Sequence, residues 1–397
     1  MADDPVVIVG AGPVGLTLAL GLARVGVSLV VLEAGSDLSA ESRASTFHPP
    51  SLEMLDQLDI AKPLMDIGLV AESFQFRDRH AGVVAEFPLR LLSEETPFPF
   101  RVQCEQGKLT RLILPVLLGY PDVTVRFDSP VDDVDVSGPR PVVHVGPEVF
   151  PASYVVGADG ASSTVRKAAG IPFPGKTYEE RYVVFSTTAN FAELIPGIAP
   201  VNYIADPEEW LVLLRTPDHW RAMFPVRDLR ASTADVANPA VAQAKLQKLL
   251  PLEEAYPVSH CALYSVHLRV APVFHRGRIV LAGDAAHINN PIGGFGMNSG
   301  IHDAFALAQT LPPMLESGHD DARLDAYSVA RRSVAATTIA RQSDENWSRL
   351  RERDPRRRDR QREQMRALAS DPDAARAYLR RACMLDPSPY LPSDPHP

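Results

Sequence analysis

Cysteine is scarce in this sequence, and the cysteines that occur form no pattern. Cys104, Cys261 and Cys383 lie far apart, and the chain has neither a C-x-x-C motif nor a His/Cys cluster with the spacing of metal ligands. This scarcity argues against a secreted disulfide framework and against a zinc module. We expect reduced thiols in a cytoplasmic protein, and no bound metal.

Long apolar runs and an excess of basic charge are also missing. No apolar run reaches the roughly 20 residues that a membrane-spanning helix needs. Asp3 and Asp4 stand where a signal peptide would be basic. The net charge of −9 disfavours a nucleic-acid partner, because phosphate binding normally needs a basic face. What the chain does have is apolar material: 45% of its 397 residues are hydrophobic, enough for a large core.

Glycines dominate the first distinctive segment. Residues 10–15, Gly-Ala-Gly-Pro-Val-Gly, lie between a short buried strand and an apolar-periodic helix. In a G-x-G-x-x-G turn the first glycine (Gly10) permits the turn, the second (Gly12) lets the backbone approach a pyrophosphate, and the third (Gly15) allows close packing. A second strand ends at Glu33, where a carboxylate binds the ribose hydroxyls of an adenosine. This context predicts a dinucleotide-binding site.

Two later segments distinguish FAD from NAD as the dinucleotide. One is Gly-Ala-Asp-Gly-Ala-Ser-Ser-Thr-Val-Arg at 157–166. The other begins as Gly-Asp-Ala-Ala-His at 283–287, continues as Pro-Ile-Gly-Gly-Phe-Gly-Met-Asn at 291–298 and ends at Asp303. With the first turn, these segments resemble the class A flavoprotein monooxygenases of the para-hydroxybenzoate hydroxylase type. The resemblance spans roughly residues 5–330.

The resemblance implies contacts to the cofactor, residue by residue. Asp159 and Gly160, with Arg166 in the same segment, would serve FAD and NAD(P)H together, and Asp284 would bond the ribityl chain of FAD. The further FAD contacts that it implies are Arg43, Gln106, Gly283 and Pro291, the last near the reactive flavin carbon.

The glycine-rich loop before a helix fits this interpretation physically. Gly293, Gly294 and Gly296 carry no side chains, so backbone N–H groups can meet the edge of a flavin. We expect a helix to begin near Met297 and to point its positive end at the same place, which would stabilise an anionic reduced flavin. Asn298 either caps this helix or bonds the flavin ring.

The family chemistry implies a reaction and its co-substrates. NADPH or NADH gives hydride to FAD, and O2 then forms a flavin C4a-hydroperoxide that hydroxylates a small electron-rich aromatic substrate, phenolic or heteroaromatic. The protein supplies position, a dry cavity and electrostatics. His48 and Pro291 are the candidate catalytic residues. For His48, the plainer alternative is a histidine at a helix start that bonds to backbone.

Aromatic residues on the predicted substrate sheet are candidates for the substrate pocket: Tyr203, Trp210 and Phe224. Their plainer interpretation is core packing. The arginine-rich stretch 349–366 is interpreted as a solvated helix face, interrupted at Pro355. We expect the C-terminal helices to pack on the core or on a second subunit, so a homodimer stays open.

The predicted fold is α/β. A Rossmann-like FAD domain is assembled from residues 1–72, 101–175 and 276–330, and a mainly antiparallel β substrate domain from 73–100 and 176–275. Helices at 331–386 and a tail at 387–397 follow.

Other outcomes stay open at this point. Relatives with this fold also catalyse epoxidation, ring opening or Baeyer–Villiger-type oxygenation, and a flavin-binding scaffold without turnover is a further alternative. A second G-x-G-x-x-G after a strand is absent, as are the F-x-G-x-x-x-H-x-x-x-W pattern of class B enzymes and the W-x-W-x-I-P pattern of halogenases.

Overall fold

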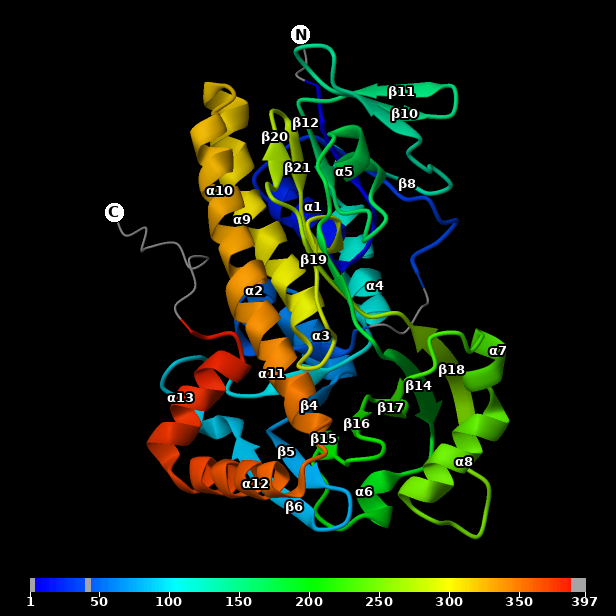
Figure 1. The fold of residues 1–397 in the computed structure, drawn as a ribbon. Helices are drawn as coiled ribbons and strands as arrows, with labels where there is room; N and C mark the ends of the chain where they lie inside the picture. The colour runs from blue at the N-terminus through cyan, green and yellow to red at the C-terminus, as the bar shows by residue number, and fades with distance from the viewer. Residues whose placement is uncertain (1–3, 40–43, 387–397) are drawn as a thin grey trace.

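A mainly parallel sheet forms the upper half of the computed structural model, which describes residues 4–39 and 44–386 (Figure 1). The sheet has six strands in the order β20-β21-β12-β1-β2-β8. β1 pairs in parallel with both β2 and β12, and all four residues of its Val-Val-Ile-Val sequence are buried, as expected for a central strand covered on both faces. The strands are β1 (Val6–Val9), β2 (Leu29–Leu32), β8 (Val123–Arg126), β12 (Tyr154–Gly157), β20 (His275–Arg276) and β21 (Ile279–Leu281).

Helices cover this sheet and carry the glycine-rich turns at their starts. α1 packs against α9 and α4, and α9 also packs against α10. In Figure 1 α9 and α10 run side by side down the molecule. The main helices are α1 (Pro13–Ala23), α4 (Gln106–Leu117), α9 (Phe295–Ser317) and α10 (Asp321–Ser333). Shorter ones are α2 (Pro49–Asp56), α3 (Ala61–Ile67) and α5 (Thr164–Ala168), and a 3₁₀ turn covers Gly283–Ala285.

A seven-stranded sheet forms the lower half, in the order β18-β14-β17-β16-β15-β5-β6. Its pairs are antiparallel except β15 with β5. The strands are β5 (Ser73–Asp78), β6 (Gly82–Pro88), β14 (Arg181–Thr187), β15 (Val201–Ala205), β16 (Leu211–Arg215), β17 (Trp220–Val226) and β18 (Val258–Tyr264). Two hydrophobic clusters contain residues of this sheet, one facing the C-terminal helices and one facing α8. The helices α6 (Phe191–Leu194), α7 (Thr233–Val236) and α8 (Pro239–Leu249) accompany it.

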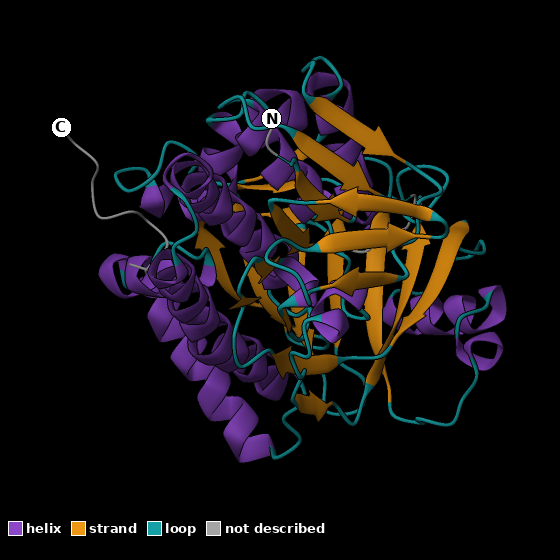
Figure 2. Cartoon of the chain, turned by 90° about the horizontal axis from the view of Figure 1, so that it is seen from above, coloured by secondary structure: helices purple, strands orange, loops and turns teal. Residues whose placement is uncertain are grey.

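Two short sheets lie between the halves, and a third lies at the top of the upper half (Figure 1). β3 (Thr46–Phe47), β7 (Arg101–Gln103) and β4 (Leu69–Ala71) form one of them, with β7 in the middle. β13 (Gly175–Thr177), β19 (His267–Val270) and β22 (His287–Ile288) form another, and β9 (Asp133–Asp135), β10 (Val142–Val145) and β11 (Glu148–Pro151) a third. A 3₁₀ turn at Leu89–Leu92 follows β6. Seen from above, most helices lie on one side of the strands and a smaller group, α7 and α8, on the other (Figure 2).

The C-terminal helices pack on the core of the same chain. A π-helical segment at Val334–Ile339 leads into α11 (Ala340–Leu350), followed by α12 (Pro355–Ser370) and α13 (Pro372–Ala382). α12 packs on β6 and α13 on the Leu89–Leu92 turn, and Met365 and Leu379 join the hydrophobic cluster of the lower sheet. The predicted interruption at Pro355 is confirmed, because α12 begins there and proline suits a first helical position. None of the described helices has the length and apolar character to cross a membrane.

Candidate active site

The first glycine-rich turn lies against the second motif. Gly10 has φ +104°, and a Cβ there would lie 2.5 Å from the carbonyl oxygen of Ala158, so only glycine fits. A Cβ on Gly15 would overlap the carbonyl oxygen of Gly10, whereas nothing lies within 4 Å of one built on Gly12. Glu33 closes the turn from β2, because its Oε2 accepts from the N–H of Ala11 at 2.7 Å.

Side chains of the second motif hold its own turn and reach the third motif. Asp159 Oδ2 accepts from the N–H of Thr164 at 2.7 Å and so caps α5. Gly160 has φ +77° and open space around its Cα. Arg166 donates from Nη1 to the carbonyl of Ala285 at 2.9 Å and from Nη2 to the carbonyl of Ala161 at 2.8 Å. Arg166 thus ties two segments far apart in the chain.

A buried ion network lies beneath the third motif. Asp303 Oδ2 accepts from the N–H of Gly283 at 2.9 Å and pairs with Nε2 of His287 at 2.7 Å, while its Oδ1 pairs with Arg331. Burial alone would raise the pKa of the Asp303 carboxyl, but the Arg331 guanidinium and His287 outweigh it and hold that pKa well below its usual range. Asp284 is exposed above this frame.

Asp303 and Arg331 hold the third motif in place, although the sequence did not indicate either as a site residue. Asp303 ended the third motif without a role, and Arg331 lies in no motif. Arg331 Nη2 also donates to the carbonyl of Ser299 at 2.9 Å, so the network fixes both the Gly283 turn and the first turns of α9.

The loop at 291–298 starts α9 earlier than expected. α9 begins at Phe295 rather than near Met297, because Gly294 takes the left-handed conformation (φ +73°) at its N-cap. No side chain caps this end. Gly293 also has positive φ (+117°), and a Cβ there would collide with the Phe295 ring at 2.2 Å. Pro291 is exposed and Gly296 half-buried, while Met297 is buried.

Asn298 joins α9 to β3. Its Oδ1 accepts from the N–H of His48 at 2.9 Å, and its Nδ2 donates to the carbonyls of Thr46 at 2.7 Å and Gly294 at 2.6 Å. All these partners are backbone groups, one in the loop, one in β3 and one in the residue that follows β3. The amide side chain therefore fixes where the two segments meet instead of capping the helix N–H groups.

His48 is buried against the same loop. Its Nε2 lies 2.9 Å from the carbonyl oxygen of Gly293, and because a carbonyl only accepts, Nε2 carries the proton and Nδ1 the lone pair. Its ring stacks on Phe295 with centroids 5.6 Å apart. Burial, and then the nearby Arg101 charge, hold the pKa of His48 well below its usual 6.5, so the ring is neutral at physiological pH. The backbone bond expected under the plainer alternative is therefore present.

The predicted pocket aromatics divide between the two faces of the lower sheet. Tyr203 stacks on Phe76 with ring centroids 5.2 Å apart, and both it and Trp210 share one hydrophobic cluster with Ile292 of the 291–298 loop. Phe224 packs in the other cluster, with Leu246 of α8. The structure thus brings Tyr203 and Trp210 toward the loop but not Phe224.

Two remaining predicted contacts lie near the first turn of α4. Gln106 is its first residue, and the N–H of Gln106 donates to the carbonyl of Ala44 at 3.0 Å. Arg43 lies outside the described residues.

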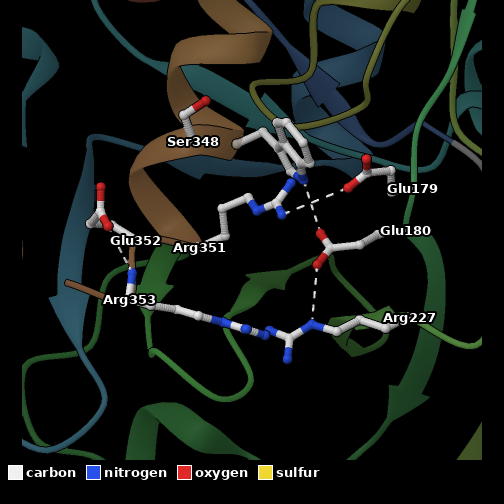
Figure 3. Close-up of a pocket in the computed structure, with 8 residues that line it drawn as sticks. Glu179, Glu180, Arg227, Ser348, Arg351, Glu352 and Arg353 are labelled. Atoms are coloured by element: carbon white, nitrogen blue, oxygen red, sulfur yellow. Dashed lines mark hydrogen bonds and ion pairs between the residues drawn. The ribbon is translucent and has the colours of Figure 1, made fainter.

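Two other polar groupings stand apart from this site. A cleft of about 570 Å³ is lined by Glu179, Glu180, Arg227, Trp347, Ser348, Arg351, Glu352 and Arg353, none of them a predicted site residue (Figure 3). Its buried Glu180 accepts from Trp347 Nε1 at 3.0 Å and from Arg227 Nε at 3.3 Å, so its charge is already matched. Glu105, Asp218 and His219 converge elsewhere, but the Lys108 ammonium pairs with both acids and occupies that position.

The residues that meet here fit a flavin dinucleotide. α1 and α9 both begin with uncapped N–H groups, as anionic groups require, and Gly12 and Gly160 leave open space beside them. The three motifs converge through Gly10–Ala158 and Arg166–Ala285 contacts. An elongated phosphate-bearing ligand with an anionic ring at one end is the chemistry that this arrangement accommodates.

Comparison with known proteins gives the same answer over most of the chain. A family model described as FAD binding domain matches residues 3–342. Para-nitrophenol 4-monooxygenase of Pseudomonas sp. strain WBC-3 is 32% identical over 385 residues, which cover 95% of this chain and 94% of that protein. The 6-hydroxy-3-succinoylpyridine 3-monooxygenase HspB of Pseudomonas putida is 33% identical over 359 residues, covering 87% of this chain and 88% of that protein.

A solved structure agrees with both. The crystal structure of p-nitrophenol 4-monooxygenase PnpA from Pseudomonas putida matches with a TM-score of 0.90 at 30% identity and covers 96% of this chain and 98% of that chain. The predicted fold class is thereby confirmed, and so are the FAD cofactor and the monooxygenase activity. The chain belongs to the FAD-dependent aromatic monooxygenases, the class A flavoprotein hydroxylases with the para-hydroxybenzoate hydroxylase fold.

Proposed function

We propose that this monooxygenase hydroxylates a small phenol or hydroxylated heteroaromatic ring, with NADPH or NADH as reductant. The observation that carries the proposal is the meeting of the flavin-type loop with an aromatic cluster: Ile292, inside the loop, belongs to the same hydrophobic cluster as Tyr203 and Trp210. Two relatives that the chain covers nearly end to end are named for a nitrophenol and a hydroxypyridine, both single-ring substrates with a ring oxygen substituent.

The proposed FAD contacts follow the three motifs. The pyrophosphate lies at the Gly10–Gly15 turn and the start of α1, the adenosine ribose at Glu33, and the ribityl chain at Asp284. Gln106, the first residue of α4, is a further proposed contact to the same cofactor. Arg43, the other contact that the resemblance implies, lies outside the described residues. When bound, FAD supplies the redox chemistry, because it accepts hydride from NAD(P)H and activates O2.

The residues around the 291–298 loop are assigned to the flavin ring, the reacting end of FAD. The uncapped start of α9, with Gly293, Gly294 and Gly296, directs N–H groups toward the flavin edge and stabilises negative charge there. His48 holds the carbonyl of Gly293 and offers Nδ1 as an acceptor beside the loop. Pro291 borders the open side. Tyr203 and Trp210 supply a water-poor wall, which protects an oxygenating flavin from unproductive peroxide release.

The experiment that tests the function is a substrate screen. Holoenzyme is mixed with NADPH or NADH and a panel of nitrophenols, hydroxybenzoates and hydroxypyridines, and nicotinamide oxidation and product mass are measured. Stimulated oxidation with one added oxygen and an intact ring supports the proposal. A ring-opened product would assign another oxygenation, and no stimulation by any aromatic compound would reduce the protein to a flavin-binding scaffold.

The cofactor contacts make a separate prediction. Glu33→Ala removes a charged hydrogen-bond acceptor at the adenosine end, so the Kd for FAD should rise about 10- to 100-fold. Asp284→Ala should lose much of its FAD during purification. FAD content and affinity are measured by flavin fluorescence, with the exposed Glu254→Ala as the control. Unchanged FAD affinity in Glu33→Ala and full retention in Asp284→Ala would place the cofactor elsewhere.

Location and assembly belong to the same proposal. All three cysteines are free thiols, which suits a reducing cytoplasm. A homodimer is tested by light scattering of the holoenzyme.

A further inference from the structure

Arg101 is a buried cation in the middle strand of the short sheet formed by β3, β7 and β4. It is the first residue of β7, and only 2% of its surface is exposed. Its Nη2 donates to the carbonyl of Ala382 at 2.9 Å and contacts Cys383 Sγ at 3.7 Å, and its guanidinium lies 4.5 Å over the Phe74 ring. Its charge also acts on the Tyr203 hydroxyl, whose pKa it lowers against the effect of burial. Nε and Nη1 have no hydrogen-bond partner among the described residues.

The groups that face Arg101 carry no negative charge. Burial raises the pKa of the Cys383 thiol and of the Tyr203 hydroxyl, and it raises that of Tyr378 to about 12, so all stay protonated at neutral pH. On the remaining side is His48, which is neutral. A guanidinium stays protonated when buried, and an unmatched buried charge is unfavourable. This part of the chain therefore holds a positive charge that lacks its counter-charge.

The position of Arg101 connects the flavin loop to the aromatic cluster. In the pairing of β3 with β7, Phe47 lies opposite Val102, which puts Arg101 beside His48. His48 in turn holds Gly293, and Tyr203 lies in the cluster that contains Ile292. The unmatched cation thus stands between the proposed reacting end of the cofactor and the proposed substrate residues.

We propose that Arg101 is the anion receptor of the substrate site and binds the ionised oxygen of a phenolate through Nε and Nη1. The proposal rests on the proposed function and names its substrate class. Phe74 and Tyr203 form the aromatic surroundings that a ring needs, and a fork of N–H donors suits an anionic oxygen. Bound as phenolate, the ring is richer in electrons at the carbon that takes up oxygen.

A phenolate explains the surroundings better than a carboxylate does. The neutral His48 adds no second positive charge, and nearly every other neighbour of the guanidinium is an uncharged aromatic ring or thiol. Charge delocalised into a ring is desolvated more easily than a compact carboxylate, and that is the anion that an aromatic enclosure accepts.

The test uses 4-nitrophenol as a chromogenic probe, because its absorbance distinguishes phenol from phenolate. It is titrated against oxidised holoenzyme from below to above its own pKa, without NAD(P)H. We expect the wild type to bind the phenolate, with the pKa of the bound probe lower than in water. Arg101→Gln should bind it about 10- to 100-fold more weakly and shift the bound probe toward the neutral phenol.

Matched controls separate this role from general damage. Arg79 is also buried but pairs with Glu209, so Arg79→Gln should leave probe binding unchanged. The uncharged methyl ether 4-nitroanisole should bind wild type and Arg101→Gln alike. If Arg101→Gln does not fold, Arg101→Lys takes its place, and it should keep the preference for phenolate at reduced affinity.

Three binding results overturn the proposal. The first is equal phenolate binding in wild type and Arg101→Gln, and the second is tighter binding of 4-nitrobenzoate than of 4-nitrophenolate. The third is an Arg101→Gln variant that loses FAD but binds phenolate normally once FAD is restored. Turnover of phenols with an unaffected Arg101→Gln would sink this inference and leave the function standing. Phenolate binding at Arg101 without stimulated NAD(P)H oxidation would do the reverse.

Discussion

Two arginines, Arg331 and Arg101, are buried to the same extent in different regions of the molecule. Arg331 lies beneath the third motif, paired with the buried carboxylate of Asp303 and with Ser299. Arg101 lies between the halves, and its partners are a carbonyl, a thiol and an aromatic ring.

The difference distinguishes a structural ion pair, here called the frame, from a charge that binds a ligand, here called the receptor. A buried charge that meets its counter-charge within the protein fixes geometry, and it has little left to offer a ligand. A buried charge whose neighbours are all neutral has been desolvated in advance, so an incoming anion gains a strong interaction. The upper half thus holds its turns with a matched ion network, while the contact between the halves keeps one charge for the substrate.

The largest effect should come from breaking the matched network. Asp303→Asn leaves Arg331 without a counter-charge, so the free energy of unfolding should fall by about 3–5 kcal/mol, with loss of FAD. Chemical denaturation of the apoprotein measures it. Asp325→Asn is the control, because Asp325 also pairs with a histidine but is 72% exposed; it should lose less than about 1 kcal/mol. A comparably small loss in Asp303→Asn would mean that the Asp303–Arg331 pair stabilises the fold no more than the exposed pair of Asp325.

Each region also contains a neutral histidine, which predicts a pH effect. Burial, and then the charge of the nearby arginine, lower the pKa of His302 to about 3 and that of His48 well below 6.5. Both are lower when folded, so the unfolded chain binds more protons below about pH 6.5 and stability falls as pH falls. The slope is about 1.4 kcal/mol per pH unit for each histidine.

Unfolding at pH 7.5, 6 and 5 measures this slope. His302→Gln or His48→Gln should each flatten it by one histidine's share. If both variants keep the wild-type slope, the two histidines are not neutral partners of their arginines.

The smallest effect should come from Arg101→Met. No described carboxylate is left unpaired by this change, and relief from desolvation offsets the lost bond to Ala382. We expect the free energy of unfolding of the apoprotein to change by at most about 1 kcal/mol, measured in parallel with Arg331→Met, which should lose several. Equal losses in the two variants would erase the distinction between frame and receptor.

Local patterns predicted what local physics determines. Positive φ occurs at four glycines of the motifs, Gly10, Gly160, Gly293 and Gly294. Because glycine adopts such φ values readily, glycines at these positions predict turns from the sequence alone. The parallel order of β1 and β2 follows from the strand–helix–strand pattern. The start of α9 was placed too late, because Gly294 in a left-handed conformation begins the helix before the expected Met297.

Non-local contacts explain what the sequence did not reveal. The contacts of Arg331 with Asp303 and of Arg101 with Ala382 arise only from tertiary packing. No spacing of residues in the sequence indicates either contact. The face on which Phe224 lies depends on how its strand pairs with its neighbours, which periodicity within one strand does not specify.

In the arginine-rich stretch, Arg358 and Arg362 bind the buried Asp78. The solvated-face interpretation therefore describes only part of it. The site assignments and domain boundaries stay predictions.

The order of strands in the upper sheet has a consequence for synthesis. β1 lies between β2 and β12, and β12 in turn pairs with β21, which ends at Leu281. A nascent chain therefore leaves the ribosome with its first glycine turn long before β12 and β21 can pair beside it, and such distant pairings form slowly. Flavin capture should accordingly wait until about three quarters of the chain has been translated, and the contact of Ala382 with Arg101 should form among the last.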